Sequence, residues 1–487
     1  MTSGSALGAA LVALLIAALA TNRGGRPSVH REAEGARWAR RRDLAALTVK
    51  GPSPGRLVLG TAGRRLVAAE RGQSVLVVGP TQSAKTTGLA IPAILEWEGP
   101  VMAASVKADL ARHTMNWRRT QGEVWLFDPT RSTGLATSAW SPLDAAITWP
   151  AARRVAHSLT EAARPAAGSM PDADFWFATA AKLLGPLLLA AASSGRCMAD
   201  VVRWLDEQEE AEVAEALFEL GADAALQAAR ATWGRDERQR SAVYTTAETV
   251  VEAFAEPPAS GGAASGAGEG NHHRVDPAVL LEGRHTLYLC APAHEQRRLR
   301  PLFSALATEV LQGAFDLAVR HGGTLDPPLL VVLDEAANVA PLAELDVLAS
   351  TAAGHGIQLV TVWQDLAQIT ARYGGRAGSV INNHRVKVFL SGIADTATLE
   401  HASTLAGESH RPQRTVTSDG RGGRSVTEAP VSRRLLPPDA VRRLPPGTGV
   451  VISGHLPPLR LALRPWWRDV ALRRRAQMGA VASPSVS

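Results

Sequence analysis

The chain has 487 residues, enough for two or three domains, and its 46% hydrophobic and 20% charged content is typical of a globular protein and excludes a largely disordered one. The net charge of +6 permits a polyanionic partner or a membrane surface. Cys197 and Cys290 lie far apart and fit no C-x-x-C or zinc pattern, so neither a disulfide framework nor a cysteine metal site is indicated, and a reducing compartment is the simplest interpretation.

Residues 6–20 (ALGAALVALLIAALA) form an uninterrupted apolar run, which reaches about 18 residues when its small flanking residues are included. No basic residue precedes the run, whereas seven arginines follow it between residues 23 and 42. By the positive-inside rule, residues 1–45 are predicted to form a single-pass anchor in the cell (inner or plasma) membrane with a basic linker, and the catalytic body is placed in the cytoplasm. A cleaved signal sequence and a buried helix are the alternatives.

Residues 74–97 (SVLVVGPTQSAKTTGLAIPAILEW) predict a strand, a glycine-started loop and a helix, in that order. The loop matches G-x-x-x-x-G-K-[ST] at Gly79, Lys85 and Thr86, but Ala84 replaces the second glycine. In a P-loop, backbone N–H groups face the phosphates, the lysine reaches the β- and γ-phosphates, and the threonine hydroxyl binds Mg²⁺. The predicted nucleotide-binding residues are Gly79, Pro80, Thr81, Gln82, Ser83, Ala84, Lys85, Thr86 and Thr87.

An ordinary glycine turn before a helix is the alternative for this loop. The chain contains only five lysines among its 52 basic residues, so the lysine at position 85 favours a site that needs a compact ammonium group.

Beyond the loop, strand patterns at 101–105 and 123–129 precede an alanine- and leucine-rich helical block at 148–256. A glycine- and serine-rich stretch at 257–270 predicts a flexible linker. Strands and helices then alternate again. We therefore predict an α/β fold with one parallel sheet, formed by residues 46–147 and 271–467, that carries an inserted all-α domain at 148–256 and ends in a disordered tail at 468–487.

The run LLVVLDEA (residues 329–336) predicts a buried strand that ends in two carboxylates. Together with a P-loop, Asp334 would hold Mg²⁺ through water and Glu335 would polarise the attacking water. Gln364, at the end of GIQLVTVWQ, could sense the γ-phosphate from a neighbouring strand. A solvated acidic pair and a polar strand terminus are the alternatives for these residues.

The residue types therefore predict ATP and Mg²⁺ as cofactors. The predicted catalytic residues are Lys85, Glu335 and Gln364, and the predicted metal ligands are Thr86 and Asp334. Lys107 and Asp109 follow the strand at 101–105 on the same expected sheet edge, where a solvated helix N-terminus explains them equally well.

These motifs resemble the coupling proteins of conjugative type IV secretion systems, the TraG/TraD-like branch of the FtsK/HerA class of P-loop ATPases, with a TraM-recognition-type C-terminal part. The resemblance spans about residues 50 to 467. It is carried by GPTQSAKTTGLAIPAILEW, SVKADL with FDP and WSPL, FWFATAAKLL, VVLDEAANVAPLAELDVLASTAAGHGIQLVTVWQDLAQITARYG and LLPPDAVRRLPPGTGVVISGHLPPLRLALRPWW.

The resemblance implies a membrane-anchored homo-hexamer of RecA-like domains, in which an all-α domain selects relaxase-bound substrate. ATP hydrolysis would drive single-stranded DNA and protein towards components of the secretion channel. The motif positions give Lys85, Thr86, Asp334, Glu335 and Gln364 the family's nucleotide roles, and residues 410–433 fall where members carry a variable surface loop. The alternative function is a docking module that binds nucleotide and recruits DNA cargo with little or no turnover.

Three departures from the family pattern bear on turnover and attachment. Ala84 adds a Cβ where glycine permits a positive φ, and Ala353 stands where some relatives have an arginine that reaches the neighbouring subunit. That arginine would then come from elsewhere, such as Arg372 or Arg385. The single short apolar run contrasts with members that have two spans. Nucleotide binding is therefore a firmer prediction than fast hydrolysis.

Overall fold

The computed structural model describes residues 35–165, 172–255, 274–292, 294–337, 342–418 and 424–478. The predicted membrane anchor at 6–20, the linker at 257–270 and the end of the chain at 479–487 lie outside the described residues. The chain divides into two compact units, Met1–Arg37 with Gly407–Leu435 and Trp38–Ala406 with Leu436–Ser487.

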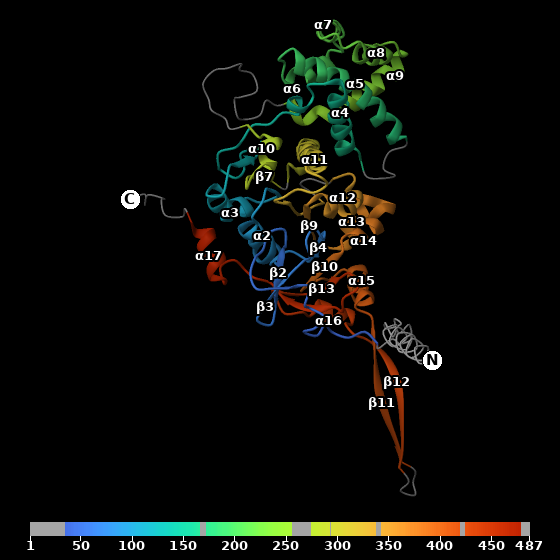
Figure 1. Cartoon of the computed structure of the whole chain (residues 1–487). Coiled ribbons are helices and arrows are strands. Elements are labelled where there is room, and N and C mark those ends of the chain that lie inside the picture. The colour runs from blue at the N-terminus through green and yellow to red at the C-terminus, as the bar shows by residue number, and fades with distance from the viewer. Residues whose placement is uncertain are drawn as a thin grey trace, which may run out of the picture. The chain divides into compact units, whose positions relative to one another are not determined.

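The described residues of the larger unit form a 12-stranded sheet (Figure 1). Its strands are β1 Thr48–Val49, β2 Val58–Ala62, β3 Arg65–Ala68, β4 Val75–Val78, β5 Val101–Ser105, β6 Val124–Phe127, β7 Thr286–Cys290, β8 Leu329–Asp334, β9 Ile357–Trp363, β10 Val386–Leu390, β13 Thr448–Ser453 and β14 Leu459–Ala462. They lie in the order β1-β3-β2-β14-β13-β10-β4-β9-β8-β5-β7-β6.

From β10 to β6 every neighbouring pair of strands is parallel. All residues of β4, β8 and β9 are buried, as expected for parallel strands that are covered on both faces. This half of the sheet agrees with the predicted α/β class, and it places β4 between β10 and β9.

The other half of the sheet differs from the prediction, because β13, β14, β2, β3 and β1 continue from β10 in antiparallel pairs. The sheet is therefore mixed, and the prediction of one parallel sheet holds only for the half from β10 to β6. Residues 63–64 join β2 to β3 and residues 454–458 join β13 to β14. Connections this short form hairpins and cannot cross over the sheet.

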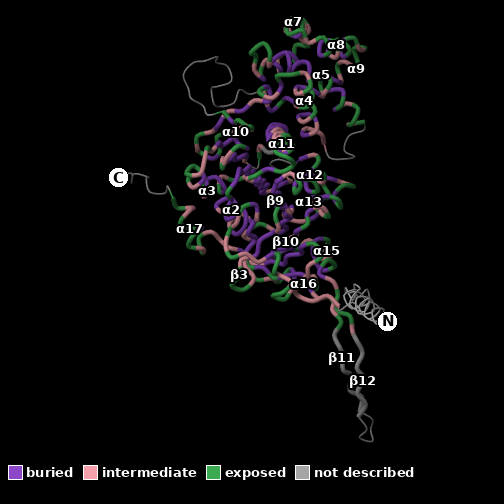
Figure 2. The backbone as a smooth tube through the Cα atoms, viewed as in Figure 1, coloured by how far each residue is buried: buried purple, intermediate pink, exposed green. Residues whose placement is uncertain are grey.

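Helices cover both faces of the sheet and enclose two apolar cores (Figure 2). On one face lie the wide turn η1 Thr86–Ala90, α2 Ile91–Glu96 and α3 Asp109–Arg119. The remaining helices of the larger unit outside the helical portion are η2 Pro142–Ala145, α10 Pro277–Leu281, α11 Gln296–Arg320, α12 Leu345–Thr351, η4 Ala352–His355, α13 Leu366–Tyr373, η5 Gly374–Arg376, α14 Ala377–Asn383, α15 Thr396–Ala406, α16 Pro438–Arg442 and α17 Val470–Gln477.

A helical portion lies between β6 and β7 in the chain. It consists of α4 Trp149–Ala163, α5 Ala173–Ser193, α6 Met198–Asp206, α7 Ala211–Glu219, α8 Asp223–Trp233, α9 Glu237–Val251 and η3 Glu252–Phe254. Helix α5 is its centre and packs against α4, α6, α7, α8 and α9. Helix α4 also packs against α11, which joins this portion to the sheet.

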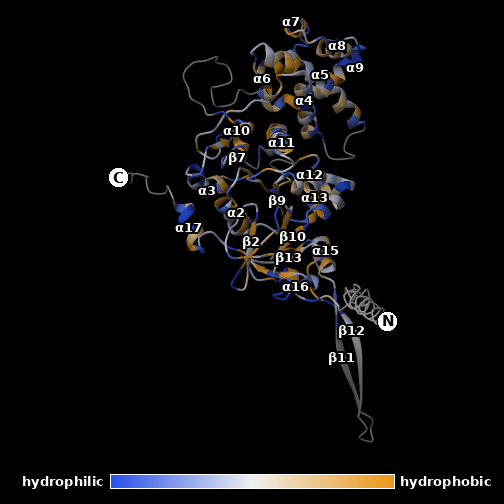
Figure 3. Cartoon of the chain, viewed as in Figure 1, coloured by the Kyte–Doolittle hydropathy of each residue, from blue (hydrophilic) through white to orange (hydrophobic). Residues whose placement is uncertain are grey.

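Within the described residues, α5 and Arg298–Arg320 of α11 have the length and hydropathy of a membrane span. However, 67% and 56% of their most apolar windows are buried inside the protein. We interpret both as core helices. Figure 3 shows the hydropathy along the chain, with both hydrophobic and hydrophilic residues in α17.

Two segments are more ordered than the sequence analysis expected. Residues 468–478 contain α17, which Asp469 caps at the N-terminus and whose Leu472 is buried. In the smaller unit, β11 Glu408–Ser418 and β12 Arg424–Arg434 pair as an antiparallel hairpin where a polar surface loop was expected.

Candidate nucleotide site

The loop after β4 is anchored at the carboxyl edge of the sheet. The Gly79 N–H donates to the Trp363 carbonyl at 3.0 Å, which fixes the start of the loop to the end of β9. The Ser83 hydroxyl donates to the Pro80 carbonyl at 2.8 Å and closes the loop on itself. The chain then enters η1, so the strand, loop and helix follow one another as the motif predicts.

Two non-glycine residues of the loop, Gln82 and Ala84, both have φ of +65°. This left-handed conformation costs an L-residue roughly 1–2 kcal/mol. The position where P-loops carry their second glycine therefore requires a positive φ here as well, and Ala84 is strained.

Lys85 lies inside the loop, with its side chain largely buried. Its Nζ donates to the carbonyls of Gly79 at 2.5 Å and Pro80 at 3.0 Å. Burial lowers the pKa of Lys85, while the nearby carboxylates of Asp334 and Glu335 act in the opposite direction. The ammonium thus lies against the loop carbonyls. When phosphate binds, the ammonium would exchange these carbonyls for phosphate oxygens.

Thr86 and Asp334 meet directly, although 248 positions separate them in the chain. The Thr86 Oγ1 donates to Asp334 Oδ2 at 2.8 Å, and the Ser105 Oγ at the end of β5 is 3.5 Å from the same oxygen. Ser105 had no assigned role in the sequence analysis. Its position at the end of a strand next to β8 is the signal that could have identified it.

Asp334 is 5% exposed, and burial raises the pKa of its carboxyl to about 6, with a further contribution from Glu335. The hydrogen bond from Thr86 and the charge of Lys85 oppose this shift. Carboxylate, hydroxyl and water oxygens are the ligands that Mg²⁺ uses at nucleotide sites. The donor set of Thr86 and Asp334 fits that ion.

Glu335 and Gln364 follow β8 and β9 at the same sheet edge. Glu335 has φ of +69°, a conformation that costs a non-glycine residue free energy and that clusters at functional sites. Gln364 directly follows Trp363, which pairs with Val78 of β4, and its backbone N–H donates to Gln368 Oε1 at 3.1 Å. Both side chains are half-buried.

The other residues considered in the sequence analysis lie around this edge. Lys107 acts electrostatically on Lys85, and its N–H donates to Ser105 Oγ at 3.2 Å. Asp109 is the first residue of α3. Ala353 is exposed in η4. Arg372 is half-buried near the end of α13, and Arg385 is exposed just before β10. None of the hydrogen bonds or ion pairs described for the chain joins these two arginines to the P-loop.

We expect Ala84→Gly to stabilise the protein slightly. It removes about 1 kcal/mol of left-handed strain, and the greater freedom of glycine in the unfolded chain offsets part of this gain. Melting temperature and steady-state ATP hydrolysis measure the effect, and a higher rate would show that Ala84 limits turnover. Gln208→Gly is the control, because Gln208 has φ of +51° in the helical portion and should change stability without changing hydrolysis.

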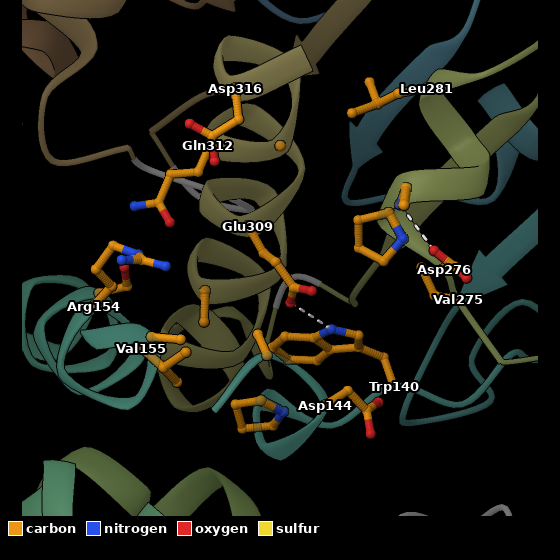
Figure 4. Close-up of a pocket in the computed structure, with 18 of the residues that line it drawn as sticks. Trp140, Asp144, Arg154, Val155, Val275, Asp276, Leu281, Glu309, Gln312 and Asp316 are labelled. Atoms are coloured by element: carbon orange, nitrogen blue, oxygen red, sulfur yellow. Dashed lines mark hydrogen bonds between the residues drawn. The ribbon is translucent and has the colours of Figure 1, made fainter. Parts of the chain in front are cut away.

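A separate cavity of about 540 Å³ lies between η2, α4, α10 and α11 (Figure 4). It is lined by none of the predicted nucleotide-site residues. The Trp140 Nε1 donates to Glu309 Oε2 at 2.9 Å inside it. Burial raises the pKa of Glu309 to about 7, and the nearby Asp144 and Asp276 add to the shift.

Glu309 should make stability depend on pH. Its folded-state pKa of about 7 exceeds the ordinary value, so the folded state binds more protons and stability falls as pH rises from about 4 to 7. Glu309→Gln keeps an acceptor for Trp140 and should remove on the order of 2 kcal/mol of this dependence, measured by melting temperature from pH 5 to 8. The exposed Glu282 offers a control, since Glu282→Gln should follow the unmodified protein.

The chain matches a family of known proteins over nearly its whole length. The model of the family described as Type IV secretory system Conjugative DNA transfer covers residues 29–486. The conjugal transfer protein TraG of Escherichia coli is 24% identical over 404 residues, which cover 77% of this chain and 62% of TraG. The chain spans about three fifths of the length of the curated relatives that it matches.

Solved structures show the same fold. The plasmid coupling protein TrwB in complex with the ATP analogue ADPNP has a TM-score of 0.66 and 19% identity, covering 91% of this chain and 96% of that one. TrwB in complex with ADP and Mg²⁺ has a TM-score of 0.61 and 20% identity, covering 93% and 98%. The likeness identifies a RecA-like P-loop fold with a helical portion.

Proposed function

Because the chain belongs to the Type IV secretory system Conjugative DNA transfer family, we propose that it binds ATP and Mg²⁺ and moves DNA for conjugation as a P-loop ATPase. The observation that carries the proposal is the hydrogen bond between Thr86 and Asp334, with Lys85 beside them. In this proposal, Lys85 supplies an ammonium that binds phosphate, and Thr86 and Asp334 supply two magnesium ligands at the same sheet edge.

The proposed roles are distributed over three strand ends. The loop from Gly79 to Thr87 cradles the phosphates, Lys85 contacts the β- and γ-phosphates, and Thr86 and Asp334 hold the Mg²⁺ that neutralises phosphate charge. Glu335 polarises the attacking water, and Gln364 senses the γ-phosphate from β9. Nucleotide-bound TrwB supports ATP and Mg²⁺ as the ligands, because the two chains share the fold.

At the level of the cell, we propose that the chain couples relaxase-bound single-stranded DNA to a secretion channel. In this proposal residues 1–45 anchor it in the cell membrane, six copies form a ring, and the helical domain at 148–256 recruits cargo. Residues 46–147 and 271–467 form the motor.

DNA-stimulated ATP hydrolysis by the full chain tests the proposal. Stimulation by single-stranded DNA supports a motor, whereas nucleotide binding without stimulated turnover supports the alternative, a docking module. Two observations favour slow turnover and therefore the docking module: the strained φ of +65° at Ala84 and the alanine at position 353.

A further inference from the structure

The first turn of the helix after the P-loop leaves two carbonyl groups without the donors that an α-helix would give them. The Ile91 N–H donates to the Thr86 carbonyl five residues back, so Thr87 loses the donor that an α-helix would give it. Gly88 loses its donor because residue 92 is a proline, which has no N–H. Buried carbonyls of this kind require partners from elsewhere.

Residues 463–469, which follow β14 and which we call the strap, supply those partners. The Trp466 N–H donates to the Thr87 carbonyl at 3.1 Å, and the Arg464 N–H donates to the Gly88 carbonyl at 3.2 Å. Alternate residues of the strap therefore pair with consecutive carbonyls of the wide turn, and each of the two carbonyls receives a donor from the strap.

The Arg464 side chain fixes the strap in place. Its two Nη atoms donate to the two carboxylate oxygens of Glu96, each at 2.9 Å, and Nη2 also donates to Asp469 Oδ2 at 2.7 Å. The Arg464 and Glu96 side chains are 10% and 7% exposed. Glu96 is the last residue of α2, so the strap contacts both the wide turn that precedes α2 and the C-terminal end of α2.

The strap lies too close to the turn for any residue but glycine at position 88. A Cβ there would approach the Leu463 Cβ to 2.9 Å. On its other side, the Trp466 ring packs against His113 of α3, with ring centroids 4.6 Å apart. The strap therefore contacts the wide turn through Leu463 and Arg464 and the neighbouring helix through Trp466.

We propose that the strap positions the nucleotide site and that Arg464 is a positioning residue for Thr86. The wide turn begins at Thr86, whose hydroxyl meets Asp334 at 2.8 Å. If the turn tightened to α-helical hydrogen bonding while α2 stayed anchored, Thr86 would rotate about the helix axis and leave Asp334. This inference rests on the proposed binding of ATP and Mg²⁺ and adds the element that sets its geometry.

Pro92→Ala separates the effect of the strap on the nucleotide site from its effect on the stability of the protein. The alanine N–H can donate to the Gly88 carbonyl inside the helix, which removes the need for the strap. We expect the melting temperature to stay equal or rise, while ATP affinity falls about fivefold or more and half-saturation requires more Mg²⁺. Unchanged affinity for ATP and Mg²⁺ would overturn the proposal.

A second pair of variants tests the proposal independently of whether Pro92→Ala folds. Arg464→Lys weakens the bidentate pair with Glu96, whereas Arg118→Lys weakens the contacts of a fully buried arginine that donates to the Trp97 and Gly99 carbonyls before β5. Both should lower the melting temperature, and only Arg464→Lys should reduce ATP affinity about fivefold. An equal reduction in both variants, or none in Arg464→Lys, contradicts positioning. If the unmodified chain itself binds no ATP, the proposed function fails instead.

Discussion

Replacing Lys85 by methionine should abolish conjugative DNA transfer and weaken ATP binding about 10- to 100-fold. Methionine fills similar volume but has no ammonium to contact the β- and γ-phosphates, and a hydrogen bond to a charged group contributes about 1.5–3 kcal/mol. The side chain is buried against the Gly79 and Pro80 carbonyls, so water cannot replace it in place. Equilibrium nucleotide binding and a mating assay measure the two effects.

Two further variants show what the lysine supplies. Lys85→Arg keeps the charge but replaces a point donor by a planar fork that the closed loop does not accommodate, so we expect it to bind ATP poorly as well. Lys182→Met removes an exposed lysine of α5 and should leave nucleotide binding unchanged. Transfer that persists in Lys85→Met would disprove the motor function, because every proposed step requires bound ATP.

The nucleotide edge of the fold could be predicted because its information is local. Strands β4, β8 and β9 are short apolar runs, polar residues stand at or just beyond the ends of β8 and β9, and the carboxyl ends of parallel strands meet at one edge. The sequence patterns of β4, β8 and β9 therefore sufficed to predict that Lys85, Asp334 and Gln364 follow strands of one sheet. The hydrogen bond between Thr86 and Asp334 joins two of these strand ends directly.

The antiparallel half and the strap could not be predicted in the same way. Strands β13 and β14 sit in the sheet because of pairings with β10 and β2, and no local pattern encodes those partners. Pro92 was visible as a helix-breaking residue one turn after Gly88, but the segment that satisfies the freed carbonyls lies about 370 positions later. Such a partner is found only in three dimensions.

The hairpin of the smaller unit has a strand pattern in its sequence, which the overall polarity of the segment obscured. The segments TVT at 415–417 and SVT at 425–427 alternate polar and apolar residues and flank a glycine-rich stretch of sequence. Val416 pairs with Val426 across the two strands. Overall polarity had suggested a loop, but the period-2 pattern was the better predictor, because strand alternation does not require a buried apolar face.

Changing Glu335 to glutamine should separate ATP binding from hydrolysis. Glutamine keeps the size of the side chain and an acceptor oxygen, but it cannot take a proton from the attacking water, so hydrolysis should fall about 10²- to 10⁴-fold while ATP affinity stays close to that of the unmodified protein. Asp334→Asn should do the opposite and weaken Mg²⁺-dependent nucleotide binding first, because it removes a proposed metal ligand. Steady-state hydrolysis and nucleotide binding with and without Mg²⁺ distinguish the two.

Glu335→Gln also allows an electrostatic test that does not depend on ATP turnover. The charge of Glu335 helps to raise the pKa of Asp334 to about 6, so its removal should lower that pKa. At pH 6 more of the Asp334 carboxyl is then ionised, and Glu335→Gln should bind Mg²⁺ with ADP more tightly than the unmodified protein, a difference that disappears at pH 8. A variant that hydrolyses ATP at the normal rate and shows no such pH dependence would exclude Glu335 from the site. Its neighbour Ala336 is held by an N–H bond to the Val362 carbonyl at 3.1 Å, so the backbone that places Glu335 should persist in the variant.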